Sequence, residues 1–386
     1  MINLPSHPRP DFPYKEPSEL VRIRQARPDG IRKARVEFAD EALYDRIYGA
    51  WLGRCAGNLL GKPVEGWSRE QIERYLTEAE AYPLDDYFPE PPSSEYRTHA
   101  PGALRGHINR ALRDDDLDYT ILNLRILEEQ GLDFTSEDVA SAWLNHLPYM
   151  QVYTAERAAY RNLVNGTSPP ESARHRNPYR EWIGAQIRAD IWGYVTPGMP
   201  ELGTELAHRD ASVSHVKNGI YGEMFVSTML SAAFVTDDIE EIIQIGLSEI
   251  PERSRLGEAV RNTVRWVQES RDWQDSWNNV MNAYGDYHWV HTLPNAAFVV
   301  LALIHGQGAF ETTVAIAVMS GHDTDCNGAT AGSIVGVLRG ARALPESWIA
   351  PLNDRVESIV AGFTDSKISD LARRTAEIAR NTLECR

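Results

Sequence analysis

The chain has 386 residues, of which 42% are hydrophobic, enough for a sizeable core, and its formal net charge is −16. So acidic a composition argues against DNA or RNA as the main partner. Cys55, Cys326 and Cys385 are far apart and odd in number, which argues against a disulfide framework or a zinc site and favours a reducing compartment. The N-terminus has no apolar signal-peptide core, and the longest apolar run, near 296–304, is too short to cross a bilayer. We therefore expect a soluble cytoplasmic protein with no membrane partner.

Residues 1–39 are rich in proline and charged residues, which predicts an extended arm that wraps the domain or frays from it. The predicted domain spans residues 40–386. Its first helix is expected from Glu41 to Gly61, with glycine at positions 49, 53, 57 and 61, a spacing that places all four on one side. Lys62–Gly66 ends this helix and leaves Glu65 just past its C-terminus, where the helix dipole disfavours a carboxylate. Glu65 is either a surface residue or part of a site.

Residues 81–113 form a long, proline-rich connection without periodicity, and such connections are often functional. They lead to Asp114, Asp115, Asp116 and Asp118, just before an apolar-periodic helix over 121–130. Capping a helix N-terminus needs one or two acidic residues, whereas this cluster has four aspartates in five positions. We interpret the cluster as half of a cation site.

Apolar residues at three- and four-residue spacing predict helices through most of the remaining chain. The predicted segments are 136–147, 178–190, 213–235, 238–248, 254–268, 293–306, 309–320, 327–340, 353–361 and 366–382. Alternating strand patterns are nearly absent, and no segment between the acidic clusters resembles a domain linker. The sequence therefore predicts an all-α fold, a single globular multi-helix bundle in which both ends of the chain contribute to one centre.

A second acidic cluster, Asp323 and Asp325, stands at the head of the helix predicted over 327–340. Gly328, Gly332, Gly336 and Gly340 again recur every four residues in this helix. Each glycine costs a helix interior roughly 1 kcal/mol relative to alanine, so close approach of another helix is the expected reason. Either the two glycine-rich helices pack directly together, or each packs against bulky side chains elsewhere. Two carboxylates this close repel, and a bound cation relieves the repulsion.

Two other motif interpretations were weighed for the acidic clusters. Residues 323–328 match the first half of an EF-hand loop, but the twelfth position is Ile334 instead of the required Glu. The Asp114-Asp115-x-x-Asp118 spacing matches the first Mg²⁺-binding motif of all-α terpenoid synthases, although their second motif is missing. A Mg²⁺-dependent terpenoid synthase is therefore an outside alternative.

The segment 184–190 and His215 are further candidates for substrate contacts. The small residues Gly184 and Ala185 could let a phosphate approach backbone N–H groups, or Arg188 and Asp190 could form an ordinary buried pair. His215 stands at the head of a predicted long helix, and a single histidine is more often a packed residue than a catalyst.

Together these landmarks resemble the ADP-ribosylglycohydrolase family over roughly residues 45–345. The glycine-rich segment Gly49–Glu65 is similar to the family motif G-x-x-x-G-x-x-x-G-D-x-x-G…E, and Asp114–Thr120 is similar to T-D-D-T-[DE]. Ser214-His215 is a further match. The most specific match is Gly321–Gly332, which is similar to G-G-D-T-D-T-x-G-A-x-x-G.

The resemblance implies an all-α enzyme with a central dinuclear site for two Mg²⁺ or Mn²⁺ ions, which hydrolyses the bond at the anomeric carbon of ADP-ribose. It implies a catalytic or metal-bridging role for Glu65 and a catalytic role for Asp116, and it places His215 at a substrate-contacting position and Gly184 and Ala185 near a diphosphate-binding loop. The implied metal ligands are Asp115, Asp116, Asp323 and Asp325.

The sequence departs from the family pattern at several of these positions. Asp114 stands where the family usually has a metal-binding Thr, and Cys326 replaces the last Thr ligand, although a thiol is a poor partner for Mg²⁺. Asn58 replaces an Asp and His322 a Gly. Asp114 and Cys326 therefore enter the candidate metal site as substitutes: the extra carboxylate either compensates for a weak thiol ligand or signals a changed metal or substrate.

We expect a metal-dependent hydrolase of an N- or O-linked ADP-ribosyl substrate, protein-linked or free, in which two cations orient the ribose and activate water. A carboxylate, Glu65 or a spare Asp, would serve as general acid or base. One alternative is an N-glycosidase for a small nucleoside-like or ribosyl metabolite. Another is a non-enzymatic relative resembling the J1 crystallins. The sequence carries no signal of the oligomeric state.

Overall fold

The computed structural model describes residues 12–385, and the predicted all-α fold is confirmed for this part of the chain. The only strands described are β1 (Arg355–Glu357) and β2 (Asp365–Lys367), which pair antiparallel. The helices are α1 Leu20–Ala26, α2 Asp40–Gly61, α3 Arg69–Glu78, α4 Asp115–Gln130, α5 Ser136–His146, α6 Thr154–Val164, α7 Glu171–Arg174, α8 Asp190–Tyr194, α9 Pro200–Ala211, α10 Asn218–Ala232, α11 Ile239–Leu247, α12 Arg255–Glu269, α13 Trp273–Tyr284, α14 Thr292–Gly306, α15 Phe310–Met319, α16 Thr324–Arg339, α17 Glu346–Ile349 and α18 Ile368–Cys385.

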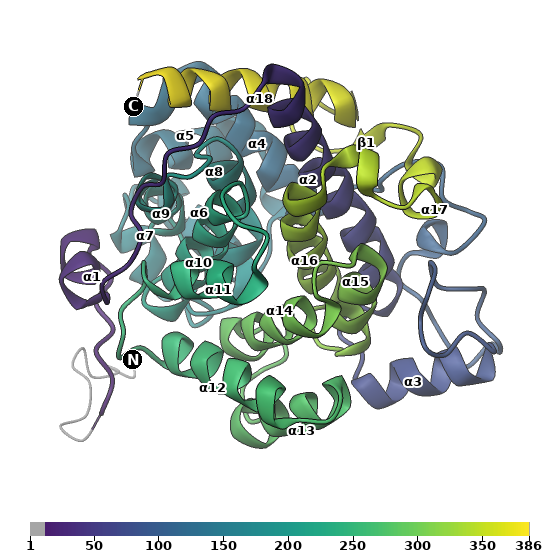
Figure 1. Cartoon of the computed structure of the whole chain (residues 1–386). Coiled ribbons are helices and arrows are strands. Elements are labelled where there is room, and N and C mark those ends of the chain that lie inside the picture. Colours follow the sequence, from purple (N-terminus) through teal and green to yellow (C-terminus); the bar gives the residue numbers. More distant parts are fainter. Residues whose placement is uncertain (1–11, 386) are drawn as a thin grey trace.

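Helices α2 and α16 pack directly against each other in the middle of the molecule (Figure 1). Their glycine stripes face each other in an antiparallel register that sets Gly49 against Gly336, and Gly53 and Gly57 against Gly332 and Gly328. A Cβ atom on any of these glycines would overlap the opposing backbone. The direct pairing of the two glycine helices, one of the two arrangements considered from the sequence, is therefore the one observed.

The antiparallel pairing brings the C-terminus of α2 to the N-terminus of α16. The hydroxyl of Thr324, the first residue of α16, donates a hydrogen bond to the Gly61 carbonyl, the last of α2, at 2.7 Å. The segments that follow α2 and precede α16 therefore lie together, although they are more than 250 residues apart in the sequence.

The remaining helices surround this central pair in a single globular domain. α14 and α15 pack against α16, α18 packs against α2, and α9 packs against α10 (Figure 1). Every residue of α10 is buried, whereas peripheral helices such as α12 and α18 bury one face only. A buried helix needs an apolar sequence all round, which is why α10 and α14 read as near-continuous apolar segments.

Two predicted helices differ from the structure. Segment 178–190 is not one helix: it contains a 3₁₀ turn, Ile183–Arg188, and the start of α8. Segment 353–361 holds strand β1. Asn353 and Asp354 precede that strand with φ values of 49° and 54°, and such backbone conformations interrupt a helix. The irregular connection over 81–113 is observed as predicted, with one short 3₁₀ turn at Pro101–Ala103.

Residues 12–39 consist of α1 and segments without regular secondary structure, and residues 1–11 of the predicted arm lie outside the described part of the chain. The described part is attached to the domain by ion pairs: Glu249 accepts from Arg27 at 2.5 Å and from Arg32 at 2.9 Å. Within residues 12–385, no helix has both the length and the apolar content that crossing a membrane requires.

Candidate metal centre

Three helix ends converge to form an acidic centre. Asp114 is the N-cap of α4 and Asp323 the N-cap of α16, while Glu65 follows the short 3₁₀ turn, Lys62–Val64, that continues α2. The N-terminus of a helix carries a partial positive charge, so two such ends stabilise nearby anionic groups. The fold therefore supplies both the carboxylates and part of the field that holds them.

Backbone hydrogen bonds lock the Glu65 segment to the Asp323 segment. The Gly66 N–H donates to the His322 carbonyl at 2.8 Å, and the His322 N–H donates to the Trp67 carbonyl at 3.0 Å. His322 has a φ of 66°, which is uncommon for a residue other than glycine and is typical of backbone held at functional sites. The Asp323 N–H donates to the Asn295 side-chain oxygen at 3.3 Å, which fixes the start of α16.

The structure brings the two predicted halves of the site together. Six carboxylates and one thiol form three overlapping groups, and within each group the candidate ligand atoms lie within 4.8 Å of one another. Asp325 belongs to two of the groups, as does Asp116. The groups are Glu65, Asp323 and Asp325; Asp116, Asp325 and Cys326; and Asp114, Asp115 and Asp116.

Mutual repulsion and burial raise the pKa values of most of these acids. The charge of Asp325, followed by burial, raises the pKa of Glu65 to about 9. Burial, followed by the charge of Asp114, raises the pKa of Asp325 to about 6 and that of Asp115 well above its ordinary range. Burial and the Asp325 charge do the same to the pKa of Asp323. Without additional positive charge the centre does not hold all of its carboxylates ionised.

Two basic residues form ion pairs with carboxylates of the centre. Burial alone would raise the pKa of Asp114, but an ion pair with Lys62 holds it below its ordinary value. Arg54 is fully buried and lies 3.3 Å from Asp116 and 2.7 Å from Asp190. Arg54 therefore fixes Asp116 from behind, while Lys62 neutralises Asp114.

The donor set fits a divalent cation. Asp325 is 4% exposed and its Oδ1 atom has no hydrogen-bond partner, although a buried carboxylate oxygen normally has one. Clustered carboxylate oxygens are the ligands that Mg²⁺ and Mn²⁺ prefer. The Cys326 thiol instead donates to an Asp116 oxygen at 3.3 Å, and burial, followed by the Asp116 charge, raises the pKa of this thiol well above its ordinary range. The oxygens suit the cation better than the sulfur does.

Asp118 lies outside these groups. Its carboxylate accepts hydrogen bonds from Arg113 Nε and from the Ser358 hydroxyl, each at 2.7 Å. A terpenoid synthase motif would need this third aspartate beside Asp114 and Asp115. The geometry gives that alternative no support.

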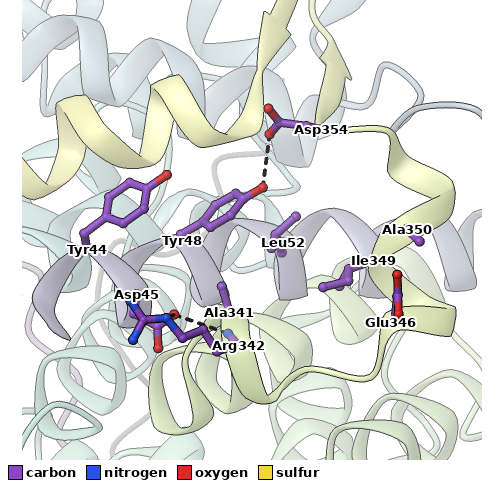
Figure 2. Close-up of a pocket in the computed structure, with 10 residues that line it drawn as sticks. All are labelled: Tyr44, Asp45, Tyr48, Leu52, Ala341, Arg342, Glu346, Ile349, Ala350 and Asp354. Carbon is purple, nitrogen blue, oxygen red and sulfur yellow. Dashed lines mark hydrogen bonds and ion pairs between the residues drawn. The ribbon is translucent and has the colours of Figure 1, made fainter. Parts of the chain in front are cut away.

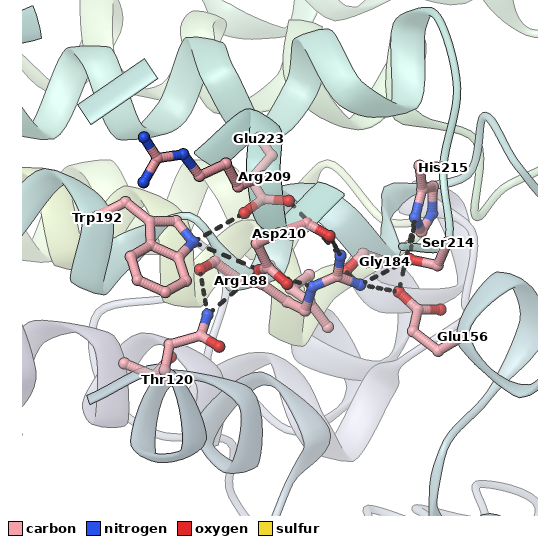
Figure 3. A network of polar contacts seen from close by, with 12 residues as sticks. Thr120, Glu156, Gly184, Arg188, Trp192, Arg209, Asp210, Ser214, His215 and Glu223 are labelled. Carbon is pink, nitrogen blue, oxygen red and sulfur yellow. Dashed lines mark hydrogen bonds and ion pairs between the residues drawn. The ribbon is translucent and has the colours of Figure 1, made fainter. Parts of the chain in front are cut away.

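The predicted substrate-contacting residues belong to a separate buried network around Arg188 (Figure 3). Gly184 packs so closely on the Glu156 carboxylate that a Cβ atom would overlap it. Ala185 is fully buried. Burial, reinforced by the Arg188 charge, lowers the pKa of His215 well below its ordinary range, so the ring is neutral; its Nδ1 atom bonds the Ser214 hydroxyl at 2.8 Å.

Arg188 and Asp190 do not form the buried pair considered from the sequence. Arg188 pairs with Glu156 at 2.8 Å and with Asp210 at 3.0 Å, whereas Asp190 pairs with Arg54. Arg188 therefore organises the His215 region, and Asp190 supports the acidic centre through Arg54.

Sequence reasoning missed Lys62, Arg54 and Asn295 as members of the centre. Arg54 could have been suspected because it is a charged residue with mostly apolar neighbours in a glycine-rich helix. Lys62 stood in the segment that ends the first predicted helix, three residues before Glu65. Their acidic partners are distant in the sequence, so composition and spacing alone do not assign them.

A cavity of about 500 Å³ lies at the other end of α2 (Figure 2). It contains the stacked rings of Tyr44 and Tyr48, and two of its three carboxylates are bound: Asp354 accepts from the Tyr48 hydroxyl at 3.2 Å and Asp45 from the Arg342 N–H at 3.2 Å. Tyr48 lies about 20 Å from Gly61 along the helix axis. The cavity is thus remote from the acidic centre.

Comparison with known proteins agrees with this architecture. The model of the ADP-ribosylglycohydrolase family matches residues 39–382. The chain is 24% identical over 313 residues to an uncharacterized protein of Archaeoglobus fulgidus, an alignment that covers 79% of this chain and 90% of that protein. A solved structure described as an ADP-ribosylglycohydrolase-related protein complex is similar with a TM-score of 0.58 at 21% identity, covering 88% of this chain and 99% of that chain.

Proposed function

Because the chain belongs to the ADP-ribosylglycohydrolase family, whose members are hydrolases, we propose that it cleaves the bond at the anomeric carbon of an ADP-ribosyl substrate with the help of divalent cations bound in the acidic centre. The observation that carries this proposal is the convergence of six buried or partly buried carboxylates, one of which, Asp325, has an oxygen without a hydrogen-bond partner within the described chain.

Asp115, Asp116, Asp323 and Asp325 would hold the cations, which we take to be two Mg²⁺ or Mn²⁺ ions. When bound, they supply positive charge that orients the ribose hydroxyls and offsets the carboxylate repulsion. Arg54 fixes Asp116, and Asn295 fixes the start of α16, so the ligand oxygens are positioned before any cation arrives.

Glu65 is the best placed acid–base group. It is partly exposed at the edge of the centre, whereas Asp116 is fully buried against Arg54. At this position Glu65 could give a proton to a leaving group and take one from water, and bound cations would offset the Asp325 charge that raises its pKa in the metal-free centre. Asp116, the other predicted catalytic residue, would serve as a ligand.

The alternative substrate, a small nucleoside-like or ribosyl metabolite, is kept because of the ion pair between Lys62 and Asp114. This pair places charge where the family usually has a threonine, next to the cations that would contact the sugar. A cytoplasmic location is also proposed, and the presence of Cys55, Cys326 and Cys385 as free thiols supports it.

The test is thermal unfolding of chelated protein with Mg²⁺ or Mn²⁺ added back, with and without ADP-ribose, beside an assay for ADP-ribose release. Stabilisation by cations that ADP-ribose increases, together with release that Glu65→Gln abolishes, would support the proposal. Stabilisation by cations without an ADP-ribose effect would favour the smaller substrate. No response to cations would refute the metal-dependent mechanism, and binding without any turnover would favour the non-enzymatic alternative.

A further inference from the structure

Lys62 brings a positive charge into the acidic centre from the α2 side. Its side chain is 18% exposed, and its ammonium group forms an ion pair with Oδ2 of Asp114, whose side chain is 5% exposed. Solvent and salt screen such a pair less than a surface pair, so the ammonium is held firmly at this position.

Both oxygens of Asp114 are engaged by the chain itself. Oδ2 binds Lys62, and Oδ1 accepts the backbone N–H of Asp116 at 3.1 Å as the N-cap of α4. The group formed by Asp114, Asp115 and Asp116 therefore already contains a cation, which the lysine supplies.

The carboxylates on the other side of the centre, Glu65, Asp323 and Asp325, form no ion pair within the described residues, although the Lys62 charge also acts on Asp325 and Glu65. Asp325 is 4% exposed, and its Oδ1 atom has no hydrogen-bond partner. Asp325 shares a group with Glu65 and Asp323 whose ligand atoms lie within 4.8 Å of one another. This side points to a cation from solution, whereas the Asp114 side does not.

We propose that the Lys62 ammonium group takes the place of one of the two cations, so that the centre binds one divalent ion at Asp323 and Asp325, beside Glu65, and admits a second at Asp114–Asp116 only when Lys62 is displaced. The inference rests on the proposed function, because it takes the acidic centre to be a cation site. It adds that the two positions are unequal and that a residue of this chain sets the difference.

Electrostatics explains why the second ion binds more weakly. A divalent ion bound next to Asp114 would be repelled by the Lys62 ammonium. The ion must therefore first break the partly buried ion pair between Lys62 and Asp114. The lysine is a compact charge on a flexible four-carbon stem, which allows it to withdraw when the ion enters. Removing the ammonium should remove this competition and leave Asp114 available as a ligand.

The experiment is a Mn²⁺ titration of chelated, full-length protein, followed by calorimetry and by electron paramagnetic resonance, which counts free Mn²⁺ and detects coupled Mn²⁺ pairs. We expect the wild type to bind one Mn²⁺ per chain and a second at least tenfold more weakly. Lys62→Met should bind two, with the second ion tightened at least tenfold and a coupled-pair signal at low Mn²⁺. Lys62→Arg, which keeps the charge, and Lys367→Met, at an exposed position of β2, should behave as the wild type.

Two Mn²⁺ ions of equal affinity in the wild type, or a second ion that Lys62→Met does not tighten, would overturn this inference and leave the proposed function standing. No Mn²⁺ bound by any variant would overturn both. Circular dichroism checks that the variants fold. If Lys62→Met does not, Lys62→Gln, which keeps a polar group at this partly exposed position, carries the same expectation.

Discussion

The Arg188 network and the acidic centre both contain more carboxylates than cations, but they balance the charge differently. In the network, one guanidinium group lies 2.8 Å from Glu156, 3.0 Å from Asp210 and 3.7 Å from Glu223 (Figure 3). Burial, followed by the charge of Asp210, raises the pKa of Glu223 well above its ordinary range, which disfavours the ionised form of this acid. The groups of the chain itself therefore come close to balancing the charge of the network.

The acidic centre is balanced less completely. Its described basic groups form ion pairs with two of the six carboxylates, Lys62 with Asp114 and Arg54 with Asp116. Asp325 keeps an oxygen without a partner, and Glu65 is partly exposed to solvent. Both clusters leave a carboxylate oxygen without a hydrogen-bond partner, Asp210 Oδ1 and Glu223 Oε2 in the network and Asp325 Oδ1 in the centre. The difference is that the network is buried around one guanidinium group, which suits a structural role, whereas the partly exposed Glu65 opens the centre to solvent and suits it to bind a cation from solution.

The largest expected effect on stability comes from removing Arg188, the cation of its buried network. Arg188→Met leaves Glu156 and Asp210 buried without their partner, which should destabilise the protein by about 3–5 kcal/mol or prevent folding. Denaturant unfolding measures this, with Arg271→Met as the control, because the exposed pair of Arg271 with Asp275 should contribute little to stability. A loss in Arg188→Met no larger than in the control would contradict a structural role for the network.

Divalent cations should stabilise the protein through the acidic centre alone. At a free Mn²⁺ concentration one hundred times the dissociation constant, we expect a gain of about 2.7 kcal/mol over chelated protein. Calorimetric melting measures it, and Asp323→Asn should lose most of the gain because it removes a ligand oxygen. If Asp323→Asn gained as much as the wild type, the cations would be acting elsewhere.

Much of the fold was predictable because it depends on local pattern. Glycine every fourth residue predicted a close helix contact, and the structure shows that each of the two stripes supplies the partner of the other. One error arose because two local structures share a pattern. Ile183 and Ile187 are four residues apart, as on one face of an α-helix, but they lie in the 3₁₀ turn Ile183–Arg188. Helices α3, α6, α9 and α13 were also missed, although the apolar residues of α13 recur every three or four positions, at 273, 277, 280 and 284.

The candidate site was predictable in its acidic part and not in its basic part. Asp114–Asp116 and Asp323–Asp325 stand in sequence beside helix N-termini, so both position and chemistry could be read locally. Lys62 lies 52 residues from Asp114, and Arg54 lies 62 residues from Asp116. Tertiary packing alone decides which acid each of these cations meets, and no spacing rule in the sequence encodes it.

Neutralising one carboxylate of the acidic centre should stabilise the metal-free protein, whereas removing the cation of the Arg188 network should destabilise it. At pH 8 the unmutated Asp325, with a pKa near 6, is ionised among other acids. Asp325→Asn should therefore stabilise metal-free protein by about 2 kcal/mol, while the stabilisation by Mn²⁺ is largely lost. Chemical denaturation with and without Mn²⁺ checks both, and Asp275→Asn, at a surface pair, is the matched control. Destabilisation of the metal-free variant would show that Asp325 is a structural partner after all.

The smallest expected effect is a pH slope that isolates Glu65. Unfolded Glu65 has released its proton by pH 7, whereas folded Glu65, with a pKa of about 9, retains it. The folded state then binds more protons, so stability falls as pH rises from about 4.5 to 9, by about 1 kcal/mol for this group between pH 7 and 8. Metal-free Glu65→Gln should lose that part of the slope, because its side chain does not titrate. Bound cations should also flatten the slope in the wild type, since nearby positive charge favours the ionised form. Equal slopes in the wild type and Glu65→Gln would mean that repulsion from Asp325 does not reach Glu65. The acidic centre would then contain fewer than the six carboxylates described.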